Sequence, residues 1–547
     1  MIIRLRTADG HFLVKKCRRA KIPQCDYCNN CIFMYNIPYK YATESKEVPV
    51  MAEKNKTKPT KNGDGLNIDK KTVISITAVL VAVLLLAGVL TQIVPRGEYT
   101  TFTDPVSGKA EITSESTYVP DDSYKMPIWK IFASPIMVFV DASTRETGMT
   151  GILIIAFIVL MGGTFLLLDR CGVLKYMVAV IIKKFGKRKY LLMAVMIFAF
   201  MMLASTAGIL EESVTVVPIA VAISLALGWD SMVGLGLSLI SIAFGFTAAT
   251  FNPFNVMTVQ RLAGDVKIFS GLWLRIIVFV LVYLVLFGFL ALYARRIEKH
   301  PEKSVSFESD KALREKYTVS DVEAVLNDNA SGKASKAFCI CLICALTCII
   351  LDFVLNVGGT LSMGGIALFF VLGGILAAHF KGYSARDILS GFGEGIKTIA
   401  PVIPLIFVVI AIAYILNTGK IMHTILYSVY KLLGGMDAYG AILLIFVFIA
   451  LLEFFIGSGT AKAFLVMPLV IPLAHLKGIS SNAVALAFSM ADGFTNLLYP
   501  TSGIMIIAIG LIGVSYRKWL KFSWPLFVAE GVVAVAVMLF SVAIGYH

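Results

Sequence analysis

Residues 453–460 read Glu-Phe-Phe-Ile-Gly-Ser-Gly-Thr and interrupt a long apolar run. A second interruption follows at residues 492–496, Asp-Gly-Phe-Thr-Asn, and at residues 500–502, Pro-Thr-Ser. The first half of the chain has a similar pair: residues 208–212 read Gly-Ile-Leu-Glu-Glu, and residues 249–254 read Ala-Thr-Phe-Asn-Pro-Phe. In hydrocarbon, polar groups and helix breaks are tolerated only where protein or a water-filled cavity receives them. Paired breaks in two halves of a membrane protein are typical of a transporter binding site between repeats.

Composition places the chain among polytopic membrane proteins. Of its 547 residues, 58% are hydrophobic and only 15% are charged, whereas a soluble domain is about half apolar and about a quarter charged. The net charge is +14, and the basic residues stand in short clusters between apolar runs, as expected for cytoplasmic loops. No basic stripe lies on a soluble domain, so nucleic acid is not an expected partner.

The first fifty residues differ from the rest. They are basic, lack a long apolar run and contain a C-x-x-C-x-x-C run at Cys25, Cys28 and Cys31. This run could ligate zinc or an iron–sulfur cluster, but no fourth ligand follows at a convincing spacing. We expect residues 1–50 to be an over-extended start or a dispensable tail. Residues 51–72 would then form a basic cytoplasmic lead that begins at Met51.

The apolar runs predict nine membrane crossings, with the N-terminus cytoplasmic because Lys70 and Lys71 precede the first run. The first repeat covers 73–294. It contains a re-entrant hairpin at 190–228 and a discontinuous helix at 231–264, broken at Asn252-Pro253. Two full spans at 190–228 are the alternative. The adjacent glutamates at the tip favour the hairpin, since they need a protein-lined, wet environment.

The second half restarts the pattern. A polar loop at 295–336, with near-balanced charge, is expected to be a solvated linker with one helix at most, and a single span at 337–356 follows. The second repeat covers 363–544, with a hairpin at 437–476 and a discontinuous helix at 480–512. Because one odd span separates the halves, the second is inverted. The expected fold is an all-α polytopic membrane protein with two inverted repeats. Tryptophans near span ends are expected in an interfacial belt: Trp129, Trp273, Trp519 and Trp524.

At these motifs the chain resembles the YfcC family of basic amino acid carriers, which is related to the DcuC-type anaerobic dicarboxylate carriers of the ion-transporter superfamily. The matching stretches are 206–212, 245–246, 252–254, 455–459, 467–468, 492–496 and 500–503, and the resemblance covers roughly 70–545. It implies two hairpins that meet two broken helices around a central site, with elevator-type alternating access. It also implies a homodimer. One departure is Ala461-Lys462, where the family pattern has glutamine after the Gly-Ser-Gly tip.

The breaks supply the candidate ligand-binding residues. Helix ends expose unpaired N–H and C=O groups, and glycine lets the backbone approach a ligand closely. Glu211 and Glu212 point about 100° apart on a helix, so only one would face a cationic amine or coupling ion, and a structural ion pair is the alternative. Asp492 is expected to begin the second break and is a candidate of the same standing. Glu453, one turn before its tip, is a less favoured candidate, and Glu530 in the last span is a weak one. The neutral candidates are Gly208, Asn252, Asn255, Gly457, Ser458, Gly459, Thr460, Gly493, Thr495, Asn496, Thr501 and Ser502.

Lys462 has two interpretations. It could clamp a substrate carboxylate, or it could form an internal salt bridge to Glu453 or Asp492, which costs desolvation unless it is well hydrogen-bonded.

Other functional classes lack their motifs. The sequence has no G-x-x-x-x-G-K-[ST] phosphate loop and no H-E-x-x-H, and no histidine is placed to activate Ser458. We therefore expect a secondary transporter of the plasma membrane rather than an enzyme. Its expected substrate is a small amino acid, moved with Na⁺ or H⁺ or by exchange, and it needs no cofactor. A dicarboxylate carrier is the alternative.

Overall fold

The computed structural model describes residues 2–6, 12–16, 70–100, 102–103, 110–111, 117–121, 125–141, 145–210, 213–267, 270–317, 322–355 and 360–547. Glu211, Glu212 and the cysteines of the N-terminal run lie outside these residues. The chain divides into two units, residues 1–63 and 64–547. In the first unit, β1 (Ile2–Arg6) pairs antiparallel with β2 (Phe12–Lys16).

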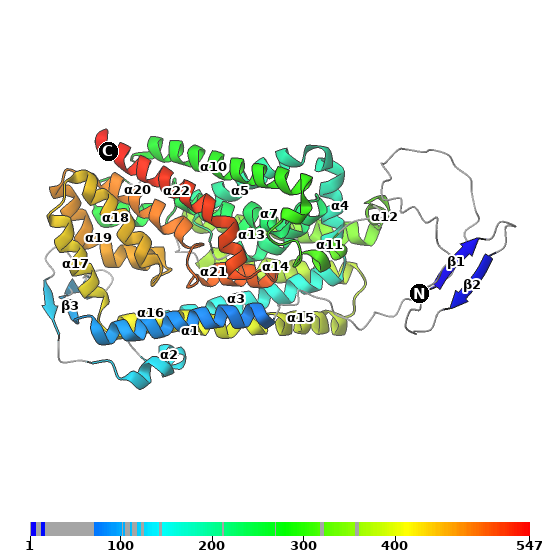
Figure 1. The fold of residues 1–547 in the computed structure, drawn as a ribbon, viewed down its shortest axis with the longest axis horizontal. Coiled ribbons are helices and arrows are strands. Elements are labelled where there is room, and N and C mark those ends of the chain that lie inside the picture. The colour runs from blue at the N-terminus through cyan, green and yellow to red at the C-terminus, as the bar shows by residue number, and fades with distance from the viewer. Residues whose placement is uncertain are drawn as a thin grey trace, which may run out of the picture. The chain divides into compact units, whose positions relative to one another are not determined.

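The second unit is built almost entirely from helices, as the apolar composition predicts (Figure 1). One group of helices comes from both halves of the chain and is held together by contacts between α13 and α14, α3 and α15, α1 and α16, α2 and α16, and α3 and α14. Its members are α1 (Lys70–Ile93), α2 (Ile128–Val140), α3 (Arg145–Arg170), α13 (Asn329–Leu355), α14 (Thr360–Phe380), α15 (Ala385–Ile399) and α16 (Ile403–Thr418).

The remaining helices contain the breaks. In the first half they are α4 (Val173–Phe185), α5 (Lys189–Ala207), α6 (Ser213–Ala226), α7 (Ser231–Leu235), α8 (Ser241–Thr247), α9 (Val256–Ala263) and α10 (Leu272–Lys299). In the second half they are α17 (Met422–Gly434), α18 (Ala438–Glu453), α19 (Gly459–Leu476), α20 (Ser481–Thr495), α21 (Gly503–Leu511) and α22 (Tyr516–Ala543). Contacts join α5 to α8, α18 to α20, α8 to α20, and α10 to α22.

Local sequence explains where these helices begin. Asp230, Asp437 and Ser480 accept hydrogen bonds from backbone N–H groups of the first turns of α7, α18 and α20. Between α7 and α8 the helix continues through a single π-helical turn at Gly236–Ile240, a feature frequent at functional sites. These caps satisfy N–H groups at the helix ends that lie away from the polar breaks.

Several described helices are long and apolar enough to cross a membrane. They cover Val173–Ala207, Leu272–Lys299, Asn329–Cys348, Gly459–Leu476 and Tyr516–Ala543, and the bent pair of α15 and α16 would add a sixth span. The chain is thus a helical, multi-span membrane protein with a helix pair that could be re-entrant or broken. The arms α6 and α18, with 14 and 16 residues, are only about 21–24 Å long, shorter than the hydrocarbon core of about 30 Å.

The polar loop between the halves is shorter and more structured than the expected linker. α10 continues to Lys299 and α13 starts at Asn329, and between them lie η4 (Pro301–Lys303), α11 (Lys311–Tyr317) and α12 (Val322–Leu326). Asp310 ties this loop to the start of α7 by accepting bonds from Ser231 N (2.8 Å) and Ser231 Oγ (2.6 Å). Burial raises the pKa of the Asp310 carboxyl, although these hydrogen bonds oppose the shift.

Short strands lie between α1 and α2. β3 (Gly97–Tyr99) pairs with β6 (Tyr118–Pro120), and β4 (Phe102–Thr103) pairs with β5 (Ala110–Glu111). The Tyr118 ring stacks on Tyr427 of α17, with ring centroids 4.3 Å apart.

The expected aromatic belt is wrong for one tryptophan. Trp129, Trp273 and Trp524 are more than half exposed, but Trp519 is fully buried. Its indole N–H donates to the carbonyl of Leu497 at 2.8 Å. Trp519 therefore satisfies a backbone acceptor that the end of α20 leaves without a helical partner.

Candidate functional site

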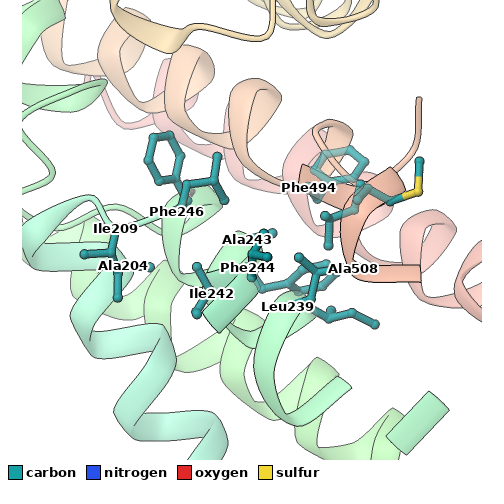
Figure 2. Packing of buried hydrophobic residues seen from close by; sticks show 14 of the residues in the cluster. Ala204, Ile209, Leu239, Ile242, Ala243, Phe244, Phe246, Phe494 and Ala508 are labelled. Atoms are coloured by element: carbon teal, nitrogen blue, oxygen red, sulfur yellow. The ribbon is translucent and has the colours of Figure 1, made fainter. Parts of the chain in front are cut away.

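Helices α8 and α20, which precede the two breaks, cross near their C-terminal ends. A Cβ at Gly493, in the last turn of α20, would lie 2.2 Å from both the backbone nitrogen and the hydroxyl of Thr247, the last residue of α8. Glycine is required there because any side chain would force the helices apart. Figure 2 shows the surrounding core, in which α8 residues from Ile242 to Phe246 lie between Ala204 and Ile209 on one side and Phe494 and Ala508 on the other.

The end of α5 is fastened to the first break. Ser205 donates its hydroxyl to the carbonyl of Ala248 at 2.7 Å, and Asn252 Nδ2 donates to the carbonyl of Ala204 at 3.2 Å. Gly208 ends α5 with φ +74°, in the left-handed region that favours glycine. A Cβ there would lie 2.6 Å from Asn252 Oδ1. These contacts hold the C-terminal end of α5 against the Asn252 break.

The tip between α18 and α19 reaches both breaks. Thr460 donates its hydroxyl to the carbonyl of Phe254 at 3.2 Å, which joins the tip to the first break. A Cβ at Gly459 would lie 2.6 Å from Asp492 Oδ2, so the same tip also touches α20. Gly457 and Ser458 are exposed, and Ser458 caps α19 through Ala461 N. The four interruptions thus meet in one region.

A buried ion cluster stands at this junction. Lys462 Nζ lies 2.5 Å from Asp492 Oδ1 and also contacts Glu453 Oε2. The lysine and aspartate are fully buried, and Glu453 is 4% exposed. Among the two interpretations of Lys462, the internal salt bridge is therefore present, with both carboxylates. One ammonium faces two carboxylates, which leaves an excess of one negative charge when all three groups are ionised.

The remaining predicted polar residues mostly complete local backbone structure. Asn255 Nδ2 donates to the carbonyl of Phe246 at 3.1 Å, and Asn496 Nδ2 donates to the carbonyl of Asp492 at 3.0 Å. Thr495 donates to the carbonyl of Ala491, and Ser502 caps α21 through Met505 N. Thr501 differs, because its buried hydroxyl has no hydrogen-bond partner within the described residues.

One expectation at the second break is wrong. Asp492 was expected to begin the break, but α20 continues for three more residues, to Thr495. The carbonyl of Asp492 is used by Asn496, and its carboxylate faces Lys462. Asp492 therefore lies within α20, one turn before the break begins.

Sequence reasoning missed two residues of this region. Ser205 bonds both to Ala248 and, at 3.0 Å, to the hydroxyl of Thr250. The sequence feature that could have identified Ser205 is a hydroxyl group one turn before Gly208 in an otherwise apolar helix. Thr247 contacts Gly493, and nothing local in the sequence distinguishes it from other helix-terminal threonines.

A separate apolar pocket lies between α3, α6, α14, α15 and α21. Its lining includes Phe165, Val214, Pro218, Phe370 and Leu511. None of the ion-cluster residues lines it. Val214 and Thr215 of its lining lie in the first turn of α6.

Comparison with known proteins assigns the family. Residues 74–543 match the family described as "DcuC: C4-dicarboxylate anaerobic carrier". This chain belongs to the DcuC family. Members of this family are membrane transporters and not enzymes, and the DcuC-family match covers every break described above.

Two relatives of this DcuC-family chain are informative. It is 30% identical over 414 residues to an Escherichia coli protein named "Putative basic amino acid antiporter YfcC", covering 73% of this chain and 79% of the relative. It is 26% identical over 403 residues to an uncharacterized Haemophilus influenzae protein, covering 71% and 76%. The resemblance to YfcC and to the DcuC carriers is therefore confirmed.

Solved transporter structures resemble the DcuC-family chain more distantly. The Alcanivorax borkumensis YdaH transporter matches with a TM-score of 0.42 and 17% identity, covering 86% of this chain and 99% of that one. Neisseria gonorrhoeae MtrF, described among antimetabolite efflux pumps, matches with a TM-score of 0.39 and 15% identity, covering 86% and 94%.

Proposed function

We propose that this DcuC-family chain is a secondary active carrier of a small amino acid, with a basic one favoured, and that the ligand binds where the four breaks meet. The main observation behind this proposal is the ion cluster. One ammonium faces two buried carboxylates, so a second cationic group would neutralise the remaining negative charge. The name of the Escherichia coli relative, a basic amino acid antiporter, supports the same substrate class.

The proposed architecture is a pair of inverted repeats, each with a re-entrant hairpin. α5 starts at the end of α10, because Lys189 pairs with Glu298 at 2.6 Å. α19 ends at the opposite end of α10, because His475 Nε2 lies 3.3 Å from Asp265, shortly before α10 begins. The two hairpins thus open toward opposite ends of the bundle, which supports inversion.

The basic clusters support an orientation. Arg295 lies over the Tyr190 ring, 5.3 Å from its centroid, and the Tyr293 and Phe522 rings are 4.8 Å apart. These contacts bring the basic ends of α5, α10 and α22 together at one end of the bundle. By the positive-inside rule, that end would face the cytoplasm of a plasma membrane.

The site has groups suited to both the amine and the carboxylate of an amino acid. The α-amine or a basic side chain would pair with Glu453 or Asp492. The substrate carboxylate would bind at the N-termini of α19 and α21, where unpaired N–H groups and the helix dipole favour an anion. Thr501, whose hydroxyl has no partner among the described residues, would add a hydrogen bond.

The direct test is uptake into proteoliposomes of labelled arginine, ornithine, a neutral amino acid and succinate. Each substrate is tested without a gradient, with a Na⁺ or H⁺ gradient, and with unlabelled substrate inside. Saturable uptake of an amino acid supports the proposal. Uptake of succinate alone contradicts it.

A dicarboxylate carrier is the second candidate, favoured by the family description and by the ammonium of Lys462 in the site. The double variant Lys462→Gln/Asp492→Asn separates the two, because it removes one charge of each sign and leaves Glu453. An amino acid carrier should retain weakened uptake, since Glu453 still holds the amine. A dicarboxylate carrier should lose uptake, since only a negative charge remains. The matched control is Ser489→Ala in the same helix, because among the described residues the Ser489 hydroxyl bonds to the carbonyl of Leu486 and to no member of the ion cluster.

A further inference from the structure

Glu530 is a buried carboxyl group that the ion cluster does not use. It lies in the middle of α22, and its side chain is 0% exposed. Leu526, Ala534 and Met538, at helical spacing on either side, are also 0% exposed. Glu530 therefore faces protein rather than lipid.

Its depth in the bundle is close to that of the ion cluster. Phe527, one turn before Glu530, packs on Phe494 of α20 with ring centroids 6.2 Å apart. Phe494 follows Asp492 by two residues, which places the two side chains about 200° apart around α20. Helix α20 thus carries Asp492 on one face and contacts the Glu530 region with the other.

No described cation neutralises Glu530. The helices in close contact with α22 are α10, α18, α20 and α21. Their titratable groups, with those of α22 itself, are Arg275, Tyr283, Tyr293, Arg295, Arg296, Glu298, Lys299, Tyr439, Glu453, Asp492, Tyr516, Arg517, Lys518 and Lys521. Lys521 is nine residues away, about 13 Å along the helix. Within the part of the chain that the structure describes, neither carboxyl oxygen of Glu530 has a hydrogen-bond partner.

Several of these groups have other partners. Tyr283 donates to Ala194 O at 3.2 Å, and Tyr293 donates to Asp230 at 2.7 Å. Asp492 and Glu453 face Lys462. An ionised carboxylate buried without a donor or counterion is strongly disfavoured, whereas a neutral carboxylic acid is tolerated. The surroundings of Glu530 thus favour its protonated form in this conformation.

We propose that Glu530 is the proton-binding group of the carrier, and that H⁺ is its coupling ion; this inference rests on the proposed carrier function. A proton from water on one side binds a carboxylate oxygen of Glu530 and leaves to water on the other side. No other bond changes. Release requires that α22 and α20 separate enough to admit water. Because α20 also carries Asp492, ligand binding at the ion cluster and proton release at Glu530 act on the same helix.

The test compares wild type with Glu530→Gln, which keeps the shape but has no titrating proton, and with Ser541→Ala on the same buried face of α22. In wild type and Ser541→Ala, an imposed H⁺ gradient should raise amino acid accumulation above that of the gradient-free control. In Glu530→Gln this ratio should fall to unity while exchange against internal substrate stays measurable. Gradient-driven accumulation by Glu530→Gln, or accumulation by wild type driven by Na⁺ but not by H⁺, would overturn the proposal.

A second measurement needs no substrate. The infrared spectrum of the purified wild-type carrier in liposomes at neutral pH should contain a carbonyl band of a protonated carboxylic acid that Glu530→Gln lacks. If the two spectra do not differ in this band, Glu530 is ionised and the proposal is wrong. If the band is present but wild type carries no tested substrate, the carrier assignment fails and the coupling role fails with it, while the protonated state stands.

Discussion

Gly493 of α20 and Thr247 of α8 approach so closely that a single added methyl group on Gly493 would lie 2.2 Å from the Thr247 backbone nitrogen. The two residues are far apart in the sequence, yet their contact fixes the crossing of the two broken helices. The end of α5 and the start of α19 also pack against the first break, through Gly208 to Asn252 and through Thr460 to Phe254.

Gly493→Ala should therefore reduce both folding yield and transport. The new methyl group overlaps backbone atoms of Thr247, which cannot move without shifting α8, and overpacking of this kind costs about 1–3 kcal/mol or more. Gly531→Ala is the control, since a Cβ there meets open space. Thermal unfolding in detergent measures both variants. Equal melting temperatures for the two would show that the crossing is not tight.

Gly208→Ala tests the fastening of the first tip. Gly208 and Gly228 have similar positive φ values, +74° and +85°, but only Gly208 has neighbours within 4 Å of an added Cβ. Each alanine substitution should lower the free energy of unfolding by about 1–2 kcal/mol, because alanine is strained in the left-handed region. Only Gly208→Ala should also weaken transport, by displacing Asn252. Comparable uptake rates for the two variants, measured in proteoliposomes, would argue against the tip contact.

Lys462→Gln should destabilise the protein by about 3–5 kcal/mol, because it leaves the buried carboxylates of Glu453 and Asp492 without their shared counterion. The double variant Lys462→Gln/Asp492→Asn should recover part of this loss, since one buried carboxylate rather than two then lacks a counterion. Lys311→Gln, which removes an exposed pair with Glu308, is the control and should change little. The readout is the melting temperature of each variant, and additive effects of the two cluster substitutions would contradict direct pairing.

Asp328 should make the joint between α13 and α14 sensitive to acid. Its hydrogen bond from Lys381 Nζ (2.7 Å), together with that from Ser331, holds the pKa of its carboxyl well below the usual range. The stabilisation is thus complete at neutral pH and is lost as pH falls through the depressed folded-state pKa. Because the Asp328 side chain is 41% exposed, solvent screening keeps the contribution below about 1 kcal/mol.

Asp328→Asn should lower the melting temperature slightly at neutral pH and reduce its decline in acid. Melting temperatures of wild type and variant across a pH series measure both effects. Parallel curves for the two proteins would show that Asp328 does not contribute.

Parts of the site could be read from the chain because the breaks are local features. Glycine, proline and carboxylate residues inside apolar runs can be identified without knowledge of the fold. In a membrane, such residues are tolerated only where protein or water surrounds them. The role of Lys462 could not be read, since a clamp and a salt bridge need the same residue. Asp492 was misplaced because the sequence does not show that Asn496 and Trp519 satisfy the carbonyls at the end of α20.

The sequence by itself determined that this is a helical membrane transporter of the DcuC family, because apolar run length and motif order follow directly from residue type. Only the tertiary structure decided which breaks meet: Thr247 with Gly493, Thr460 with Phe254, and Lys462 with both Glu453 and Asp492. It also decided that Glu530 lies buried without a described partner. The physical reason is that burial and pairing depend on helices distant in sequence, whereas helix formation in the membrane depends on each segment alone.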